Sequence, residues 1–318
     1  MKKYIPALFL TGILLLAGCG QTPQAAKAEA RLHIVTTIFP EYDWVREILG
    51  ERADEVDLTL LLDNGVDLHS YQPTASDMVK LSTCDMLVYS GGESAAWVEE
   101  ALAEADNRNM SVISLLDVIG DAAKEEELVE GMQGDAEEEG AYDEHVWLSL
   151  RNAGAVCAAL AEKLSELDPA GRAVYEANAD AYIAKLNALD AEYTNAVGAA
   201  KRDTLLFGDR FPFLYMTKDY GLDYYAAFAG CSAETEASFE TVIFLANKVD
   251  ELGLPAVITI ENSDGKLAQT IIDSTMSKNA RILRLDSLQS VTARDIAGGM
   301  SYLGVMEENL AVLRQALG

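Results

Sequence analysis

One uninterrupted helical segment in the middle of the chain most constrains its fold. Between Arg172 and Val197 there is no glycine or proline, and apolar residues recur with an approximate helical period. Asp168 as an N-cap and Pro169 at the first helical position predict where the helix begins. The predicted helix covers 169–199, about 30 residues and about 45 Å. A helix of this length either crosses one domain or joins two.

Segments with alternating strand and helix character lie on both sides of this helix. Runs rich in β-branched residues predict strands, at 31–38, 55–62, 85–92, 111–115, 204–207, 222–228, 255–260 and 280–285. A turn is expected at 39–40, and the last helix at 295–318. The pattern predicts an α/β fold with an N-terminal lobe over 31–168 and a C-terminal lobe over 200–318, joined by the helix.

The N-terminus indicates export and a lipid anchor. Lys2 and Lys3 precede an apolar run that is too short to span a bilayer, and small residues come directly before Cys19. We expect residues 1–18 to be a signal peptide, Cys19 to be lipidated, and 19–30 to be a flexible tether. The mature protein should then be extracytoplasmic and anchored to the cell membrane.

The charge of the chain favours cations as partners. There are 24 Lys and Arg residues against 52 Asp and Glu residues, which argues against nucleic acid and anionic lipid as partners. Ten of the acidic residues lie within 124–144, together with a single lysine. We expect a mobile surface loop there, which is either simply solvated or raises the local cation concentration. Beyond Cys19 the cysteines are odd in number and show no CxxC spacing, so their pairing stays open: Cys84, Cys157 and Cys231.

Only three histidines are present, so each can be weighed singly. His33 lies inside a predicted strand and is expected to be an ordinary strand residue. His69 follows the predicted strand 55–62, and His145 follows the acidic run. Open α/β domains place their sites at the carboxyl ends of strands. Neutral imidazole with a carboxylate suits Zn²⁺ or Mn²⁺, so His69 and His145 are candidate ligands.

Short motifs over nearly the whole mature chain resemble a known family, the lipoprotein metal-binding subunits of zinc and manganese ABC importers. The matching segments are Gly65–Pro73, Tyr89–Trp97, Asp143–Ser149, Tyr220–Leu222, Ser232–Ser238, Thr259–Ser263 and Leu285–Leu288. The resemblance implies two lobes joined by one rigid helix, as in cluster A-type periplasmic binding proteins. It also implies a metal ion held between the lobes, with His69, His145 and Asp286 as ligands, zinc first and manganese next.

The family pattern is broken at one ligand position. Where the family has histidine or glutamate, this chain has Arg210, which stays protonated and cannot bind a cation. Three interpretations are open: Asp209 supplies an oxygen, water fills the position, or Arg210 pairs with a carboxylate such as Asp286 and regulates the site. We favour Asp209. Three further carboxylates are spare candidates, expected to be structural or second-sphere: Glu234, Glu236 and Glu261.

The sequence therefore predicts a monomeric solute-binding protein that passes a transition-metal ion to an ABC transporter permease. An enzyme is disfavoured because the chain has no HExxH, nucleophile elbow or P-loop. The remaining alternative is the same scaffold acting in cell adhesion or binding an anionic metal chelate, with Arg210 in the cleft.

Overall fold

The computed structural model describes Met1 and residues 31–133, 141–232 and 236–318. Apart from Met1, the predicted signal peptide, Cys19 and the tether lie outside the described residues, as does Glu234. Arg31–Gly318 form one compact unit. Within the described ranges, no helix combines the length and apolar character needed to cross a membrane.

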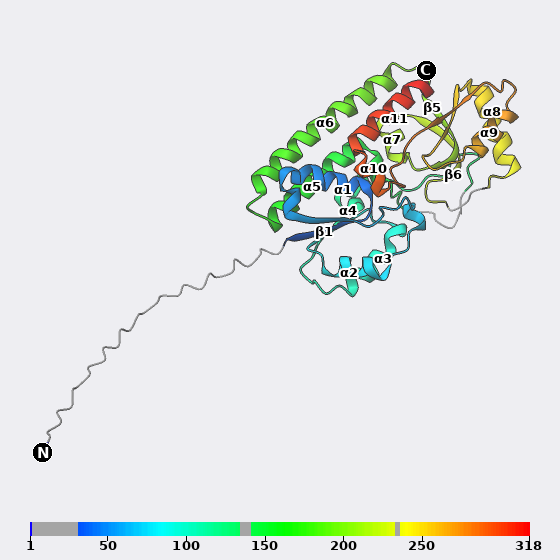
Figure 1. Cartoon of the computed structure of the whole chain (residues 1–318). Helices are drawn as coiled ribbons and strands as arrows, with labels where there is room; N and C mark the ends of the chain where they lie inside the picture. The colour runs from blue at the N-terminus through cyan, green and yellow to red at the C-terminus, as the bar shows by residue number, and fades with distance from the viewer. Residues whose placement is uncertain (2–30, 134–140, 233–235) are drawn as a thin grey trace. The chain divides into compact units, whose positions relative to one another are not determined.

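The first half of the unit contains a parallel four-stranded sheet with the order β2-β1-β3-β4. Figure 1 labels β1 of this sheet. Its elements are β1 (Leu32–Thr36), α1 (Phe39–Leu49), η1 (Gly50–Glu55), β2 (Val56–Leu60), η2 (Leu68–Ser70), α2 (Ala75–Thr83), β3 (Met86–Tyr89), η3 (Glu93–Ala95), α3 (Ala96–Ala103), β4 (Ser111–Ser114), α4 (Leu115–Ile119) and η4 (Gly120–Ala122). Because all strands are parallel, their carboxyl ends meet at one edge of the sheet, from which the loop carrying His69 follows β2.

Helix α1 begins where a turn was predicted, so that prediction is wrong. Pro40 lies in the first turn of the helix, where the amide that proline lacks would have no intrahelical partner. The Glu41 carboxylate accepts hydrogen bonds from the backbone N–H groups of Thr37, at 2.7 Å, and Ile38, at 3.1 Å. Glu41 is fully buried, and this burial raises its pKa to about 8.

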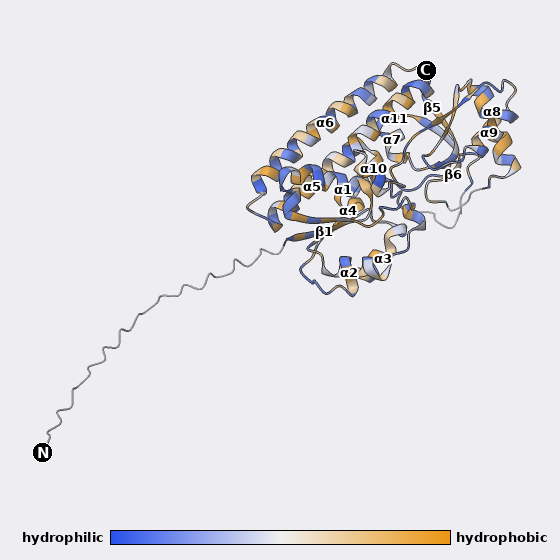
Figure 2. Cartoon of the chain, in the orientation of Figure 1, coloured by the Kyte–Doolittle hydropathy of each residue, from blue (hydrophilic) through white to orange (hydrophobic). Residues whose placement is uncertain are grey.

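Helix α6 (Arg172–Gly198) confirms the long helix that the sequence predicts. Its buried side chains recur every three or four residues and form one stripe: Tyr175, Ala179, Tyr182, Leu186, Leu189 and Tyr193. The helix packs against α1, α5 (Leu150–Leu167) and α11 (Tyr302–Leu317), and Figure 2 shows polar and apolar residues alternating along it. The predicted cap is wrong, because Asp168 ends α5 and Gly171 precedes α6.

The second half contains another parallel four-stranded sheet, with the order β6-β5-β7-β8. Its elements are β5 (Thr204–Phe211), α7 (Leu214–Tyr220), β6 (Asp223–Ala229), α8 (Phe239–Leu252), β7 (Ala256–Thr259), α9 (Lys266–Ser274), β8 (Arg281–Arg284) and α10 (Ala293–Ala297). The predicted last helix is two helices, because Gly298 and Gly299 separate α10 from α11. Helix α11 then returns to pack against α1 of the first half and against α6.

Two sheets joined by a long helix confirm the predicted fold class, while the exact lobe boundaries stay a prediction. The main hydrophobic core includes buried residues from both sheets and α6. A smaller cluster lies between the second sheet and helices α8 and α9. The parts of the chain on either side of α6 therefore share a core, which favours a stiff connection between them.

The acidic segment is a surface loop over 124–133, as its charge predicts, but its last two acidic residues are buried. Gln133 forms backbone hydrogen bonds with Ala227 and Ala229, of 2.8 and 3.1 Å, at the edge strand β6. Asp143 and Glu144 are buried rather than exposed. Residues 134–140 lie outside the described part. The segment thus leaves the first half of the unit and pairs with the sheet of the second, because the edge of β6 has unpaired backbone groups.

Candidate metal site

His69 and His145, the two histidines singled out from the sequence, lie side by side. His69 is in η2, which follows β2, and His145 directly precedes η6 (Val146–Leu148). Their Nε2 atoms are 3.2 Å apart. Two nitrogens that bind one tetrahedral Zn²⁺ at about 2.0–2.1 Å would be about 3.3–3.4 Å apart. The pair therefore has the spacing of two ligands of a single ion.

The other nitrogen of each ring is held by a hydrogen bond. His69 Nδ1 lies 2.6 Å from Ser94 Oγ, and His145 Nδ1 lies 3.1 Å from Asp143 Oδ1. A carboxylate only accepts hydrogen bonds, so His145 Nδ1 carries the proton. Partners of this kind fix the ring orientation and leave Nε2 available for a metal ion.

The protonation of the two rings differs because their surroundings differ. Burial and the neighbouring His145 lower the pKa of His69 to about 3, so its imidazole is neutral. For His145, burial lowers the pKa, but the carboxylates of Asp143, Glu144 and Asp67 together outweigh this and the pKa is raised overall. His145 is fully buried. A buried ring beside an aspartate is well suited to offset the charge of a bound cation.

Cys231 completes a cluster that the sequence analysis did not anticipate. Among the described residues, donor atoms of His69, His145 and Cys231 all lie within 4.8 Å of one another. Cys231 follows the end of β6, and its backbone N–H donates to Glu126 Oε1 at 3.2 Å. A Cβ at Gly230 would lie 3.1 Å from His145 Cε1, so glycine lets the chain approach the ring here. The signal available in the sequence was a cysteine directly after a strand of the second half.

Asp209 and Asp286, the predicted oxygen ligands, are not brought into this cluster. Asp209 lies at the end of β5, where its carboxylate accepts from the backbone N–H groups of Arg210, at 2.9 Å, and Ile260, at 3.4 Å. Asp286 Oδ1 accepts from Leu288 N–H at 2.8 Å, and burial with the nearby Glu261 raises its pKa to about 6. Asp209 is thus held by backbone groups of its own sheet, and Asp286 shapes its own loop.

Glu261 and Glu236, two of the spare carboxylates, also lie outside the cluster around the two histidines. Glu261 accepts hydrogen bonds from the backbone N–H groups of Ser287, at 2.8 Å, and Gln289, at 3.2 Å. It therefore holds the loop that contains Asp286. Glu236 is exposed. Neither belongs to the group of donor atoms around the two histidines.

Arg210 pairs with a carboxylate, but the partner is Asp67 and not Asp286. Arg210 Nη2 lies 2.5 Å from Asp67 Oδ2, and both side chains are largely buried. The other oxygen of Asp67 accepts from the His69 backbone N–H at 3.0 Å. The pair therefore joins β5 of the second half to the loop that positions His69 in the first. The Arg210 guanidinium helps to hold the pKa of Asp67 below its usual value, against the effect of burial.

Comparison with known proteins identifies the family. The sequence profile described as zinc-uptake complex component A, periplasmic (ZnuA), matches residues 34–316. The chain belongs to this ZnuA family. That assignment places it among solute-binding proteins, which are not enzymes.

Relatives in the ZnuA family are named for zinc. The chain is 31% identical to the zinc-binding lipoprotein AdcA of Streptococcus pneumoniae serotype 4, over 99% of this chain and 61% of AdcA. It thus spans about three fifths of the length of that relative. It is also 28% identical to the high-affinity zinc uptake system protein ZnuA of Bacillus subtilis, over 96% of this chain and 94% of that protein.

Solved structures share the fold. The Zn(II)-bound ZnuA-like domain of S. pneumoniae AdcA superposes with a TM-score of 0.71 and 29% identity, over 90% of this chain and 99% of that domain. The metal-dependent lipoprotein YcdH of B. subtilis gives 0.74 and 26%, over 90% of this chain and all of that one. A laminin-binding adhesin of Streptococcus agalactiae, 24% identical with a TM-score of 0.72 over 90% of this chain and all of that one, shows the fold alone.

Proposed function

We propose that this chain is the extracytoplasmic solute-binding component of a zinc ABC importer and that it captures Zn²⁺ through His69, His145 and Cys231. The observation that carries the proposal is the 3.2 Å separation of the two Nε2 atoms, with Cys231 in the same cluster of donors. The names of the ZnuA-family relatives agree with zinc as the cargo.

The donor set favours zinc over manganese. Two imidazoles and one thiolate are ligands that Zn²⁺ prefers, whereas Mn²⁺ is favoured by carboxylate, carbonyl and water oxygens. The predicted carboxylates Asp209 and Asp286 have backbone partners of their own and do not join the donors. The fourth position of a tetrahedral site is left for water.

The proposal includes delivery and anchoring. After cleavage of residues 1–18, a lipid on Cys19 would hold the protein at the cell membrane through the tether 19–30. There the lobes (31–168 and 200–318), joined by the predicted linking helix (169–199), would present the ion to the permease as a monomer. Labelling of cells with a radioactive fatty acid tests the anchor: the chain should be labelled and Cys19→Ala should not.

Calorimetric titration with Zn²⁺ and Mn²⁺ tests the metal site. The chelator-stripped protein should bind one Zn²⁺ tightly and Mn²⁺ weakly, and His69→Ala or His145→Ala should abolish the tight binding. Weak, multiple binding that is indifferent to both histidines would refute the proposal, because scattered surface carboxylates would then account for it.

The alternative ligand, an anionic chelate, is less well supported. The guanidinium of Arg210 is engaged by Asp67 at 2.5 Å, so an anion would have to displace a carboxylate of this chain. A role in adhesion has no independent support, since the likeness to the laminin-binding adhesins is one of fold.

A further inference from the structure

A small cavity lies directly beside the proposed zinc ligands. It has a volume of about 210 Å³. Its lining combines two of the zinc ligands with three carboxylates: His69, Glu93, Ser94, Glu126, Ala141, Tyr142, Glu144 and Cys231. We refer to it as the inner cavity. None of these three glutamates belongs to the cluster of donor atoms formed by His69, His145 and Cys231. Their carboxylate oxygens are therefore additional to the proposed zinc site.

Glu144 has a carboxylate oxygen without a hydrogen-bond partner. Its side chain is buried, with 2% of the residue exposed. Oε1 accepts from the Ser94 backbone N–H at 2.7 Å, whereas Oε2 is buried and makes no hydrogen bond within the described residues. A buried carboxylate oxygen with no partner is costly, and the cost is offset when the group takes up a proton or coordinates a cation.

Gly92 and Ser94 hold the Glu144 carboxylate in its buried position. Gly92 has a φ of +82°, and a Cβ on it would lie only 2.4 Å from Glu144 Cγ. The glycine therefore makes room for the glutamate. Ser94, which donates its N–H to Glu144, also contacts His69 Nδ1 through its hydroxyl, at 2.6 Å. Ser94 thus links the Glu144 carboxylate to His69 through two hydrogen bonds.

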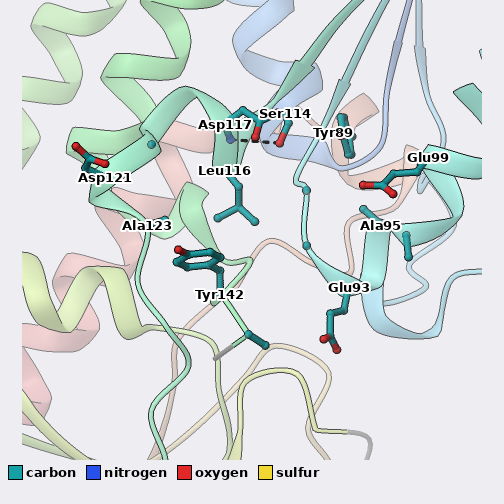
Figure 3. Close-up of a pocket in the computed structure, with 15 residues that line it drawn as sticks. Tyr89, Glu93, Ala95, Glu99, Ser114, Leu116, Asp117, Asp121, Ala123 and Tyr142 are labelled. Atoms are coloured by element: carbon teal, nitrogen blue, oxygen red, sulfur yellow. Dashed lines mark hydrogen bonds between the residues drawn. The ribbon is translucent and has the colours of Figure 1, made fainter. Parts of the chain in front are cut away.

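A larger acidic cavity adjoins the inner one, and we refer to it as the outer cavity. Its volume is about 910 Å³, and four carboxylates line it: Glu93, Glu99, Asp117 and Asp121. Figure 3 shows Glu93 and Glu99 on one side of this cavity, with Asp121 and Tyr142 on the other. Glu93, Ala141 and Tyr142 line both cavities, so the two cavities are neighbours at these residues.

We propose that the inner cavity is a second cation subsite, in which Glu144 and Glu93 hold a hydrated divalent ion before His69, His145 and Cys231 bind it. The ion arrives through the outer cavity, whose carboxylates raise its local concentration. Carboxylate oxygens suit an ion that still keeps most of its water, and imidazole and thiolate then replace that water. The inference rests on the proposed function, since it concerns loading of the same zinc site.

Stopped-flow mixing of the metal-free full chain with Zn²⁺ tests this subsite. The Trp147 ring centroid lies 5.3 Å from that of His145, so tryptophan fluorescence reports when the ion reaches the histidines. Glu144→Gln should lower the association rate constant about 10-fold, at the lower end of the acceleration that charged clefts provide. Glu93→Gln, at an exposed position where folding is not at risk, should lower it about 3-fold.

Glu307→Gln is the matched control, because Glu307 is exposed on α11 and lines neither cavity. It removes the same charge and should keep the wild-type rate. Equal rates for Glu144→Gln, Glu93→Gln and Glu307→Gln would overturn the subsite while leaving zinc binding intact. A wild-type chain that binds no Zn²⁺, or a His69→Ala variant that binds as well as wild type, would instead overturn the proposed function and the subsite with it.

Discussion

The ion pair between Arg210 and Asp67 should make a measurable contribution to stability. Arg210→Met keeps the length of the side-chain stem and removes the charge. Asp67→Asn keeps an oxygen for the His69 backbone N–H and removes the charge that Arg210 faces. Each variant leaves the charge of the remaining partner without an opposite charge beside it. That partner is largely buried, since 19% of the Arg210 side chain and 16% of the Asp67 side chain are exposed.

The expected magnitude lies between two limits. Exposed pairs contribute about 0–1 kcal/mol, and removing one partner of a fully buried pair costs about 3–5 kcal/mol. At this degree of exposure each single variant should lower the free energy of unfolding by about 2–3 kcal/mol, close to the range for a charged hydrogen bond. The double variant should lose about as much as either single variant, which gives a coupling energy of about 2–3 kcal/mol.

Urea unfolding of the four proteins in the presence of a chelator measures this coupling, since bound zinc would add its own stabilisation. The pair Arg172–Glu176 on α6 is a control of the same charge type, with 52% and 57% of its side chains exposed. Its cycle should give no more than about 0.5 kcal/mol. If the losses from Arg210→Met and Asp67→Asn simply add, the pair does not join the two halves energetically and the reasoning is refuted.

Three further predictions concern the zinc site and the pH dependence of stability. Cys231→Ser should lower the affinity for Zn²⁺ at least about 100-fold, measured in competition with a fluorescent chelator. Losing only a hydrogen-bond partner of a ligand already lowers metal affinity about 10–100-fold, and Cys231 is proposed as a ligand itself. Unchanged affinity would show that Cys231 does not bind the ion. Asp143→Ala should lower the affinity for Zn²⁺ about 10–100-fold in the same assay, because the His145 ring loses the carboxylate that orients it. For Glu41, the pKa in the folded chain is raised to about 8, so the folded state binds more protons than the unfolded state between pH 4.5 and 8. Stability should therefore fall as the pH rises through this range, by up to about 1.4 kcal/mol per pH unit from this group, and urea unfolding of Glu41→Gln should show a smaller slope than wild type.

Much of the fold could be predicted from local patterns. Helix α6 was predicted because its segment lacks glycine and proline as far as Val197 and its apolar residues keep an approximate helical period, which depends only on neighbours along the chain. The β-branched runs predicted the strands for the same reason. Helix α1 was missed at its start, because Phe39–Pro40 suggests a turn until the Glu41 carboxylate is seen to satisfy the preceding amides.

The candidate site was predictable only in part. His69 and His145 stood out because histidine is rare and each follows a recognisable pattern. Cys231 did not stand out, because a single cysteine without CxxC spacing has no local signature of a ligand. Asp209 was favoured as a substitute for Arg210, but backbone amides of its own sheet take up its oxygens. The partner of Arg210 was likewise undetermined, since Asp67 is 143 residues away.

The sequence by itself determined the two β/α halves, the helix between them and the two histidines. These depend on residue type and on periodicity over short distances, which the chain carries at every point. Only the tertiary structure decided that Cys231 meets the histidines, that Arg210 binds Asp67, and that Glu144 keeps a buried oxygen without a hydrogen-bond partner beside the inner cavity. Each of these contacts joins segments far apart in the chain, and the packing of the two sheets through a shared core sets their distances.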